Sequence, residues 1–367
     1  MRSRAALVVV AVAAGLLAVL ARVTPPAALA WRAVARPADG PADVRLTGLP
    51  SGEPLLVAGQ GGPVARPRPL LWLVPTEGDW QAVALDPASY YGERAALAWV
   101  ARLGDQVAAI GEAFGGAHGL PRFSTWAGST SGLDETPQAF ELFGGPSAIG
   151  VTDLAVGPQV TLAVGSWAAG GRPAGIAVWV GDGAAYLRLD VVPGLRSTAR
   201  DLTTPSAVAA RGEGFVVAGT TTHLGGGRVA DQATAFWVAG AGSPWSRTAL
   251  PSSGESRSVD VSCSVRDCLV AGVAGVDRGR LALWHLGADG RASTVSLDAP
   301  PELADAPAIH VAGAWVSAET TAGPRLWWVD GATAWPVQPP PGPVAALATS
   351  GERLYALGTG GALWSAP

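Results

Sequence analysis

Two cysteines, Cys263 and Cys268, are the only ones in the chain and stand in the stretch SCSVRDCLVAG, residues 262–272. Such a pair can hold a metal, act as a redox centre or form a disulfide. A zinc site needs further cysteine or histidine ligands, and a catalytic Cys-x-x-Cys spacing is absent. The four histidines lie singly in different parts of the chain, as His118, His223, His285 and His310. The sequence therefore favours a disulfide.

The residues between the cysteines predict a tight β-hairpin. If Val265 and Arg266 form a two-residue turn, Ser264 and Asp267 close it, and the cysteines face each other at the next, non-hydrogen-bonded pair. That type of pair brings side chains closest, near the separation that a disulfide needs. The loop is short, so the disulfide should contribute roughly 2 kcal/mol. Disulfides persist in oxidising surroundings, outside the cytoplasm.

Polar and aromatic residues that could contact a ligand gather in the connections between apolar segments. We expect residues 220–232 to form a flexible loop, and residues 86–94 to present paired aromatics suited to stacking on a sugar or a partner chain. Arginine and aspartate in loops also often cap turns, so each candidate has a structural interpretation as well. The candidate ligand-binding residues are Tyr90, Tyr91, Trp167, Arg172, Arg200, Asp201, His223, Arg228, Asp231, Asp277 and Arg278.

No recognisable catalytic motif is present. The glycines at 225–227 are not followed by Gly-Lys-Ser/Thr, and no Gly-x-Ser-x-Gly occurs between a strand and a helix. We therefore expect no catalytic residue, no metal and no cofactor. The alternative is a pair of carboxylates assembled from distant segments, as in enzymes that cleave polysaccharides. The acids considered for that role are Glu112, Asp153, Asp201, Asp231 and Asp260.

A repeated pattern organises the elements that must position these residues. Each unit has an alternating apolar strand, a more continuous apolar strand that usually ends in glycine, a loop rich in glycine, arginine and proline, and a third strand that carries tryptophan. Seven such tryptophan positions are spaced 37 to 58 residues apart, which suits the four-stranded blades of a propeller. They are Trp72, Trp126, Trp179, Trp237, Trp284, Trp327 with Trp328, and Trp364.

Six fourth strands are expected at residues 80–85, 138–142, 186–189, 245–250, 293–297 and 334–337. The seventh repeat lacks one after Trp364, and residues 31–35 have the same pattern as the other fourth strands. We expect residues 31–35 to complete the last blade and close the ring. The predicted fold class is all-β: a seven-bladed β-propeller of four-stranded blades in one domain, residues 31–367, with the recurrent tryptophans buried between blades.

The stretch that begins "SC", turns and continues "CLVAG" resembles the Ser-Cys…Cys-x-Ala-Val-Gly repeat of secreted bacterial β-propellers. It is also loosely similar to the sialidase-like and photosystem-assembly-factor propellers. The resemblance implies a propeller fold and concerns a repeat, not an active site. One of the seven repeats carries the cysteines, the sialidase motif Ser-x-Asp-x-Gly-x-x-Trp is absent, and the Gly-Gly that ends the second strand of kelch repeats is missing.

The N-terminus predicts export. A basic start precedes an uninterrupted apolar run at residues 5–21, and Ala28 and Ala30 stand where a signal peptidase reads small residues. We expect residues 1–30 to be a signal peptide or, if uncleaved, an N-terminal membrane anchor. The apolar run is shorter than the roughly 20 residues of a spanning helix. The protein is thus expected to be secreted or extracytoplasmic, or membrane-anchored through residues 5–21.

The charge balance limits the partners. The chain has 25 basic residues, all arginine, and 29 acidic residues, and loss of residues 1–30 would leave 22 arginines and a net charge of about −7. This balance argues against nucleic acid and against anionic lipid. We expect a monomer that binds an extracytoplasmic protein or glycan through its loop face without catalysis. The alternatives are a polysaccharide hydrolase or lyase, and a membrane-tethered assembly or secretion factor.

Overall fold

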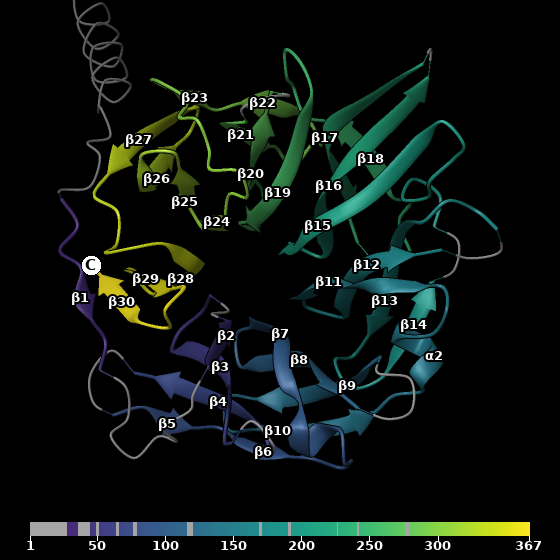
Figure 1. Ribbon diagram of the computed structural model, residues 1–367, viewed down its shortest axis with the longest axis vertical. Coiled ribbons are helices and arrows are strands. Elements are labelled where there is room, and N and C mark those ends of the chain that lie inside the picture. The colour runs from purple at the N-terminus through teal and green to yellow at the C-terminus, as the bar shows by residue number, and fades with distance from the viewer. Residues whose placement is uncertain are drawn as a thin grey trace, which may run out of the picture.

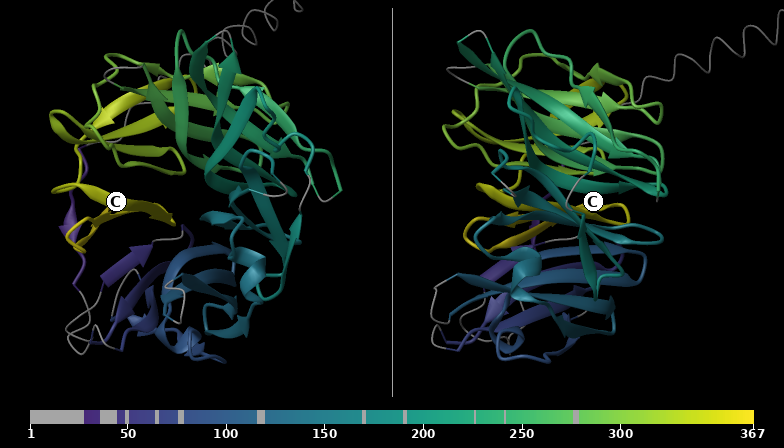
Figure 2. Two further views of the ribbon diagram at one scale, coloured as in Figure 1. Left: turned by 45° about the vertical axis from the view of Figure 1, so that its right-hand side comes forward. Right: turned by 90° about the vertical axis from the view of Figure 1, so that its right-hand side faces the viewer.

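The computed structural model describes residues 28–35, 45–48, 51–63, 66–75, 79–115, 120–168, 171–189, 192–225, 227–240, 242–275 and 279–367. Over this part of the chain, seven sheets follow one another around a ring (Figure 1). The predicted all-β, seven-bladed β-propeller is therefore confirmed. In Figure 2 the yellow C-terminal strands lie beside the purple N-terminal strand, where the ring closes.

The first four blades are numbered from the first complete sheet in the chain. Blade 1 contains β2 (Arg45–Gly48), β3 (Leu55–Gly61), β4 (Arg68–Val74) and β5 (Gln81–Ala82). Blade 2 contains β7 (Ala96–Leu103), β8 (Gln106–Phe114), β9 (Pro121–Ser129) and β10 (Gly132–Pro137). Blade 3 contains β11 (Ala148–Val156), β12 (Thr161–Trp167), β13 (Gly175–Gly181) and β14 (Tyr186–Leu189). Blade 4 contains β15 (Asp201–Arg211), β16 (Gly214–Gly225), β17 (Arg228–Val238) and β18 (Ser246–Ala249).

The last three blades complete the ring. Blade 5 contains β19 (Ser256–Cys263), β20 (Cys268–Ala274), β21 (Arg280–Leu286) and β22 (Ala292–Thr294). Blade 6 contains β24 (Ile309–Ala312), β25 (Trp315–Thr320), β26 (Gly323–Asp330) and β27 (Thr333–Val337). Blade 7 contains β28 (Val344–Ser350), β29 (Arg353–Gly358), β30 (Leu363–Ala366) and β1 (Arg32–Ala33).

Two of the predicted fourth strands, residues 80–85 and 293–297, are not single strands: the second half of each pairs with the next blade. The chain leaves β5 at the edge of blade 1 and continues as β6 (Ala84–Asp86), which pairs in parallel with β10 of blade 2. In the same way, β23 (Ser296–Leu297) follows β22 and pairs in parallel with β27 of blade 6. The added strands cover Gly132 to Asp134 of β10 and Thr333 and Ala334 of β27, so the remaining outer edges are only three residues long, which limits pairing with other chains.

The hydrophobic core is divided among the seven interfaces between neighbouring blades. Each cluster of buried apolar side chains draws on two adjacent blades, from blades 1 and 2 through to blades 7 and 1. Trp126, Trp179 and Trp284 are at most 1% exposed. The indole N–H of Trp179 donates to the carbonyl of Leu142 at 2.7 Å, so its polar atom is satisfied within the core. Trp72, Trp126, Trp179, Trp284 and Trp327 are buried, as the sequence predicted, whereas Trp237, Trp328 and Trp364 are half-buried.

The N-terminal strand closes the ring as predicted. Arg32 pairs with Ser365, and Ala33 pairs with Trp364, in antiparallel register between β1 and β30. The pairing continues where the N–H of Val34 donates to the carbonyl of Leu363 at 2.9 Å. Next to β1, Leu29 is buried in the cluster between blades 6 and 7, and the indole N–H of Trp31 donates to the carbonyl of Gln338 at 3.1 Å.

The fourth strand of blade 2 was predicted wrongly. Residues 138–142 were expected to form it, but β10 precedes them, and they lead into the short helix α2 (Phe140–Phe143). The reason is packing: Phe143 is 1% exposed and stacks on Trp179 with ring centroids 5.3 Å apart, so this segment fills the interface between blades 2 and 3. The other short helix is η1 (Gly92–Arg94), which precedes β7.

The cysteine hairpin forms as predicted. Cys263 ends β19 and pairs with Cys268 at the start of β20, and a disulfide joins them. The N–H of Ser264 donates to the carbonyl of Asp267 at 2.8 Å and closes the turn, while the Ser264 hydroxyl accepts the N–H of Asp267 at 3.0 Å. The disulfide holds one hairpin and indicates an extracytoplasmic location. Among the described residues, no helix is long and apolar enough to cross a membrane.

Candidate functional site

Blade 4 carries an unusually long β-hairpin. Its first three strands contain 11, 12 and 11 residues, against nine, seven and seven in blade 3. Residues 220–232, which we expected to be a flexible loop, continue β16 and begin β17, and the two strands stay paired from Phe215 to Gly225. The run of three threonines at 220–222 favours strand because threonine is β-branched. The outer end of the hairpin projects from the ring at the upper right of Figure 1.

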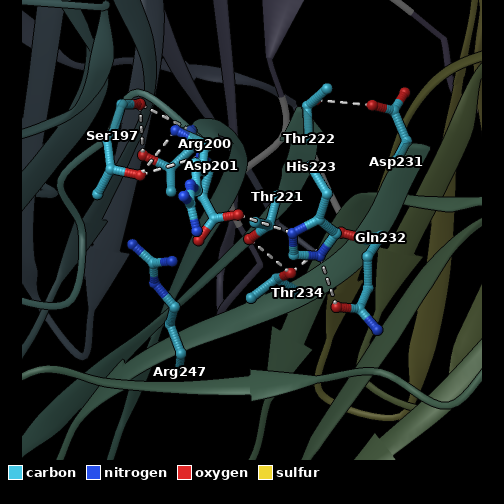
Figure 3. Close-up of polar contacts among 12 residues, drawn as sticks. Ser197, Arg200, Asp201, Thr221, Thr222, His223, Asp231, Gln232, Thr234 and Arg247 are labelled. Atoms are coloured by element: carbon cyan, nitrogen blue, oxygen red, sulfur yellow. Dashed lines mark hydrogen bonds and ion pairs between the residues drawn. The ribbon is translucent and has the colours of Figure 1, made fainter. Parts of the chain in front are cut away.

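Three side chains on one face of the blade 4 sheet, from β15, β16 and β17, form a polar network (Figure 3). His223 on β16 pairs with Asp201 on β15, and the His223 Nδ1 atom lies 2.8 Å from Asp201 Oδ1. The His223 Nε2 atom lies 3.2 Å from Oε1 of Gln232 on β17. The side chains of His223 and Asp201 are 47% and 37% exposed, so the network faces solvent.

The network favours the charged form of its histidine. The hydrogen bond with Asp201, followed by that with Gln232, raises the pKa of His223 above its ordinary value, while burial and the charge of Arg247 oppose the rise. An imidazolium carries a proton on each nitrogen and can donate to both acceptors, whereas the neutral ring can donate to one. The hydrogen bonds of this face are therefore complete when His223 is protonated.

The opposite face of the hairpin is tied to blade 5. The Thr222 hydroxyl donates to Asp231 Oδ1 at 2.7 Å, and Nε of Arg257 on β19 lies 3.0 Å from Asp231 Oδ2. Adjacent residues of a strand point to opposite faces, so Thr222 and His223 look in different directions. Asp231 therefore neutralises an arginine of the next blade and does not join the His223 network.

The connection between β14 and β15 runs beside the His223 network. The N–H of Thr198 donates to the carbonyl of Asp201 at 2.7 Å. From β18, Arg247 donates through Nε to the carbonyl of Gly194 at 2.7 Å and through Nη2 to the carbonyl of Arg196 at 3.0 Å. These hydrogen bonds hold the connection against blade 4.

A small cavity of about 70 Å³ lies on the other side of this connection. Two predicted residues line it: Trp167 at the end of β12 and Arg172 in the turn before β13. Arg188 of β14 and Arg196 of the connection line it as well. The sequence reasoning did not single out Arg188, because an arginine in a fourth strand looks like an ordinary exposed strand residue. We call the surface that holds the cavity and the network the blade 3–4 surface, made of Trp167, Arg172, Arg188, Arg196, Arg200, Asp201 and His223.

The tip of the long hairpin carries another predicted residue. Arg228 begins β17, pairs with Gly225 across the turn and is exposed. Asp277 and Arg278 lie outside the described residues. The structure therefore places Trp167 and Arg172 at the cavity, pairs Asp201 with His223, leaves Arg228 at the tip of the hairpin, and turns Asp231 to the opposite face.

The paired tyrosines lie in blade 2 and do not contact this surface. Tyr90 is 59% exposed, and its ring meets that of Tyr91 edge to face with centroids 5.5 Å apart. The Arg94 guanidinium stands 4.2 Å from the centroid of the Tyr90 ring. The turn that precedes the tyrosines is held by Glu135, whose side chain is buried at 6% exposure. Oε2 of Glu135 accepts the N–H of Ser89 at 2.8 Å. Tyr90 and Tyr91 thus form a separate, rigidly held aromatic pair.

Four of the five acids considered for catalysis, Asp153, Asp201, Asp231 and Asp260, have structural partners. Both oxygens of Asp153 accept backbone N–H groups, Oδ1 from Leu154 at 2.8 Å and Oδ2 from Val208 at 2.7 Å. Burial, which outweighs these hydrogen bonds, raises the pKa of Asp153 to about 7. Asp260 has the same environment, and burial raises its pKa to about 6. Glu112 lies on β8 in blade 2, where partial burial raises its pKa.

The fold and the site define a seven-bladed β-propeller with a polar, arginine-rich surface between two blades. Among the described residues, no group of three metal-ligating side chains is present. No protein-family model and no curated protein matches the sequence.

Several solved structures nevertheless have a fold similar to that of this chain. The chain is 9% identical to the β-propeller domain of the Trilobed protease from Pyrococcus furiosus, with a TM-score of 0.55 over 88% of this chain and 95% of that one. It is 11% identical to Pyrococcus horikoshii acylaminoacyl peptidase, with a TM-score of 0.54 over 86% of this chain, and spans 49% of that peptidase. Trypanosoma rangeli sialidase in complex with the inhibitor DANA is 12% identical, with a TM-score of 0.44 over 93% of this chain and 60% of that one.

The likenesses to the two Pyrococcus structures show the propeller fold alone. The Trilobed protease domain is described as having an open velcro topology, whereas β1 pairs with β30 and closes the ring in this chain.

Proposed function

We propose that this protein is an exported, non-catalytic β-propeller that binds a protein or glycan outside the cytoplasm through the blade 3–4 surface. The observation that carries the proposal is the His223 network: an exposed histidine, held between Asp201 and Gln232 on regular strands, with arginines beside it. Side chains fixed in this way lose little entropy when a ligand binds.

The same network argues against nucleophilic catalysis at this site. A histidine that acts as a general base in a catalytic triad holds a carboxylate with one nitrogen and a nucleophile with the other. In His223 the second nitrogen meets the amide oxygen of Gln232, which is not a nucleophile of that kind.

The contacts of the carboxylates argue against glycoside hydrolysis as well. A glycoside hydrolase needs two carboxyl groups that face its substrate. Asp153 and Asp260 are engaged with backbone N–H groups of their own and the neighbouring strands. Asp201 holds His223, and Asp231 holds Thr222 and Arg257.

A binding screen tests the proposal. The chain is produced with its own N-terminal segment in an exporting host and applied to arrays of glycans and of secreted proteins. We expect a ligand whose affinity falls at least tenfold in His223→Ala and in Arg200→Ala, and stays unchanged in Arg68→Ala, an exposed arginine of blade 1. Ligands that bind the blade 3–4 variants as tightly as the native chain would contradict the proposal. Cleavage of a polysaccharide that is abolished in Asp201→Asn would favour the hydrolase or lyase instead.

Export is tested separately by the mass of the mature chain. We expect cleavage before Trp31, because the small residues Ala28 and Ala30 precede it. An intact mass that retains residues 1–30, with the protein in the membrane fraction, would favour the alternative of a membrane-tethered assembly or secretion factor.

A further inference from the structure

An apolar groove of about 490 Å³ lies between blades 3 and 4. Leu187 and Leu189 of β14 line it on the blade 3 side, and Phe215 near the start of β16 and Trp245 before β18 line it on the blade 4 side. No charged side chain is among the described residues that line the groove, and among them Ser243 supplies the one hydroxyl. A charged group would lose its hydration there without gaining a partner. The groove therefore favours an uncharged, apolar occupant.

The wall formed by β14 is exposed and has the side-chain spacing of a strand. Leu187 is 67% exposed and Leu189 is 37% exposed. Residues two positions apart in a strand point to the same face, so the two leucines stand side by side along the groove. Among the described residues, no strand lies beyond β14 in its sheet. An extended peptide that runs along β14 would present aliphatic side chains to the groove at the same spacing.

The chain fills two other spaces between blades with segments of this kind (Figure 1). The connection that enters blade 2 forms β6 at the edge of β10, and Val83 and Leu85 join the apolar cluster between blades 1 and 2. The connection that enters blade 6 forms β23 at the edge of β27, and Val295 and Leu297 join the cluster between blades 5 and 6. In both connections, the valine N–H donates to a leucine carbonyl in the third strand of the preceding blade at 2.9 Å. A short extended segment with two aliphatic residues, two positions apart, is thus what this fold places between blades.

The connection that enters blade 4 forms no such strand among its described residues. The sheets of blades 3 and 4 have four strands each. Pro193 has no backbone N–H to donate, and the connection is held instead by the side chain of Arg247, which donates to the carbonyls of Gly194 and Arg196. Val192 packs against the apolar cluster between the two blades and lines the groove. The groove is therefore a space between blades that the described part of this connection lines but does not occupy.

We propose that the groove between blades 3 and 4 docks an extended segment of a partner protein, which lies along β14 and inserts two aliphatic side chains, two positions apart, between the blades. The partner is defined by its chemistry: an uncharged stretch with the pattern aliphatic-x-aliphatic. Alternate side chains of an extended peptide give this mode of recognition its specificity. The inference goes beyond the proposed function, because the His223 network takes no part in it.

Fluorescence anisotropy with a labelled peptide tests the proposal. The probe is WQAVALD, the sequence of residues 80–86, because it contains one of the two segments that the chain places between blades. We expect it to bind, and the version with Val83→Ser and Leu85→Ser to bind at least tenfold more weakly. The peptide WQAAVLD has the same composition, but its valine and leucine are adjacent and point to opposite sides when extended. It should also bind at least tenfold more weakly.

Variants of the chain locate the binding. Leu187→Asp should weaken the binding of WQAVALD at least tenfold, because a carboxylate then stands in the apolar groove, and Leu187→Met should keep it. Ile149→Asp is the matched control: Ile149 lies on β11 of the same blade, is 63% exposed and is not among the residues that line the groove. Because Leu187 and Ile149 are both exposed, the two aspartate variants should keep the native melting temperature.

A library of random nonapeptides removes the dependence on one sequence. Selection on the native chain should yield the pattern aliphatic-x-aliphatic, enriched at least tenfold over selection on Leu187→Asp. If WQAVALD does not bind and the library yields no such pattern, the proposal is wrong. Equal affinity for WQAVALD and WQAAVLD, or a Leu187→Asp variant that binds like the native chain, would also overturn it.

An acyl chain is the other occupant that an apolar wall accepts, and palmitate is the probe for it. We expect palmitate to bind more weakly than the selected peptides. Palmitate that binds more tightly than every selected peptide, and loses affinity in Leu187→Asp, would assign the groove to a lipid and overturn the proposal.

This inference and the proposed function can fail separately. His223→Ala should leave the affinity for WQAVALD unchanged, since His223 does not line the groove. If no peptide binds in the groove but another ligand depends on His223, the proposed function stands alone. If peptides bind in the groove and no ligand depends on His223, the groove stands and the proposed function fails.

Discussion

Asp153 and Asp260 occupy the same position of the repeat, two blades apart. Each stands twelve residues before the glycine of the second strand, Gly165 in blade 3 and Gly272 in blade 5, and each follows a β-bulge in the innermost strand. The glycine makes room for the bulge: a Cβ atom on Gly165 would lie 2.1 Å from the carbonyl oxygen of Gly150.

The two aspartates also make the same contact with the blade that follows. Asp260 Oδ2 accepts the N–H of Val311 on β24 at 2.7 Å, as Asp153 Oδ2 accepts that of Val208 on β15. At the corresponding position of blade 2, the indole N–H of Trp99 donates to the carbonyl of Thr152 at 2.7 Å. Polar side chains of the innermost strands therefore connect successive blades around the ring.

Removal of an aspartate should weaken these connections. We expect Asp153→Ala and Asp260→Ala each to lower the free energy of unfolding by about 1–3 kcal/mol, because buried backbone N–H groups lose their acceptors. Alanine is compatible with the local backbone, since Ala207 holds this position in blade 4. Urea unfolding at pH 7 measures the loss, and variants as stable as the native chain would contradict it.

The pH dependence of stability should reveal the same two carboxyl groups. Their pKa values in the folded chain, about 7 for Asp153 and about 6 for Asp260, lie above the value of about 3.9 for an unfolded aspartate. The folded chain then binds more protons than the unfolded chain between about pH 4 and 7. The stability that these groups contribute is full below about pH 4 and is lost as the pH rises through 6 and 7.

Substitution by asparagine isolates this effect. We expect the free energy of unfolding of the native chain to fall more between pH 5 and 8 than that of the Asp153→Asn/Asp260→Asn variant, since asparagine does not titrate. Denaturation curves at a series of pH values measure both. Parallel profiles for the two proteins would show that the buried carboxyls do not titrate in this range.

Ring closure should depend on residues 31–35. Their deletion removes the pairing of β1 with β30 and exposes the apolar surface that Trp31 and Val34 cover in the neighbouring clusters. Loss of roughly 2–4 kcal/mol should lower the melting temperature by several degrees. Arg32→Ala is the control, because its side chain is exposed and the backbone pairing remains. An unchanged melting temperature after the deletion would contradict closure of the ring by β1.

The disulfide should be present in the protein after oxidative folding and have a modest effect on stability. Neither cysteine should react with iodoacetamide before reduction, and both should react after it. Cys263→Ser/Cys268→Ser should lower the free energy of unfolding by roughly 2 kcal/mol, as expected for a short loop. Alkylation of both cysteines without reductant, read by mass, would show that the bond does not form.

Much of the fold could be predicted because each blade repeats a local pattern. The seven tryptophan strands all lie where the sequence placed them, and the Cys263–Cys268 hairpin forms because turn and cysteines are close in sequence. The exceptions are among the fourth strands. Residues 138–142 have apolar residues that suit a strand but fill the space beside Trp179 as the start of a helix. Residues 80–85 and 293–297 each divide between two blades. The sequence pattern does not show which neighbour a short apolar segment will meet.

The site was predictable only in part. Trp167 and Arg172 could be named from their types, but their meeting with Arg188 and Arg196 depends on how three segments of blade 3 and its connection fold together. Asp153 and Asp260 were considered as catalytic acids, and their shared distance from the second-strand glycine was the one signal in the sequence of a structural role.

The sequence by itself determined the number of blades, the strands that carry tryptophan, the disulfide hairpin and the strand that closes the ring, because each follows from a periodic or local pattern of residues. Only the tertiary structure decided that residues 220–232 are a long hairpin, that His223 lies between Asp201 and Gln232, and that three arginines surround one cavity. Those relationships join residues of separate strands, and their distances depend on strand register and on the packing of one blade against the next.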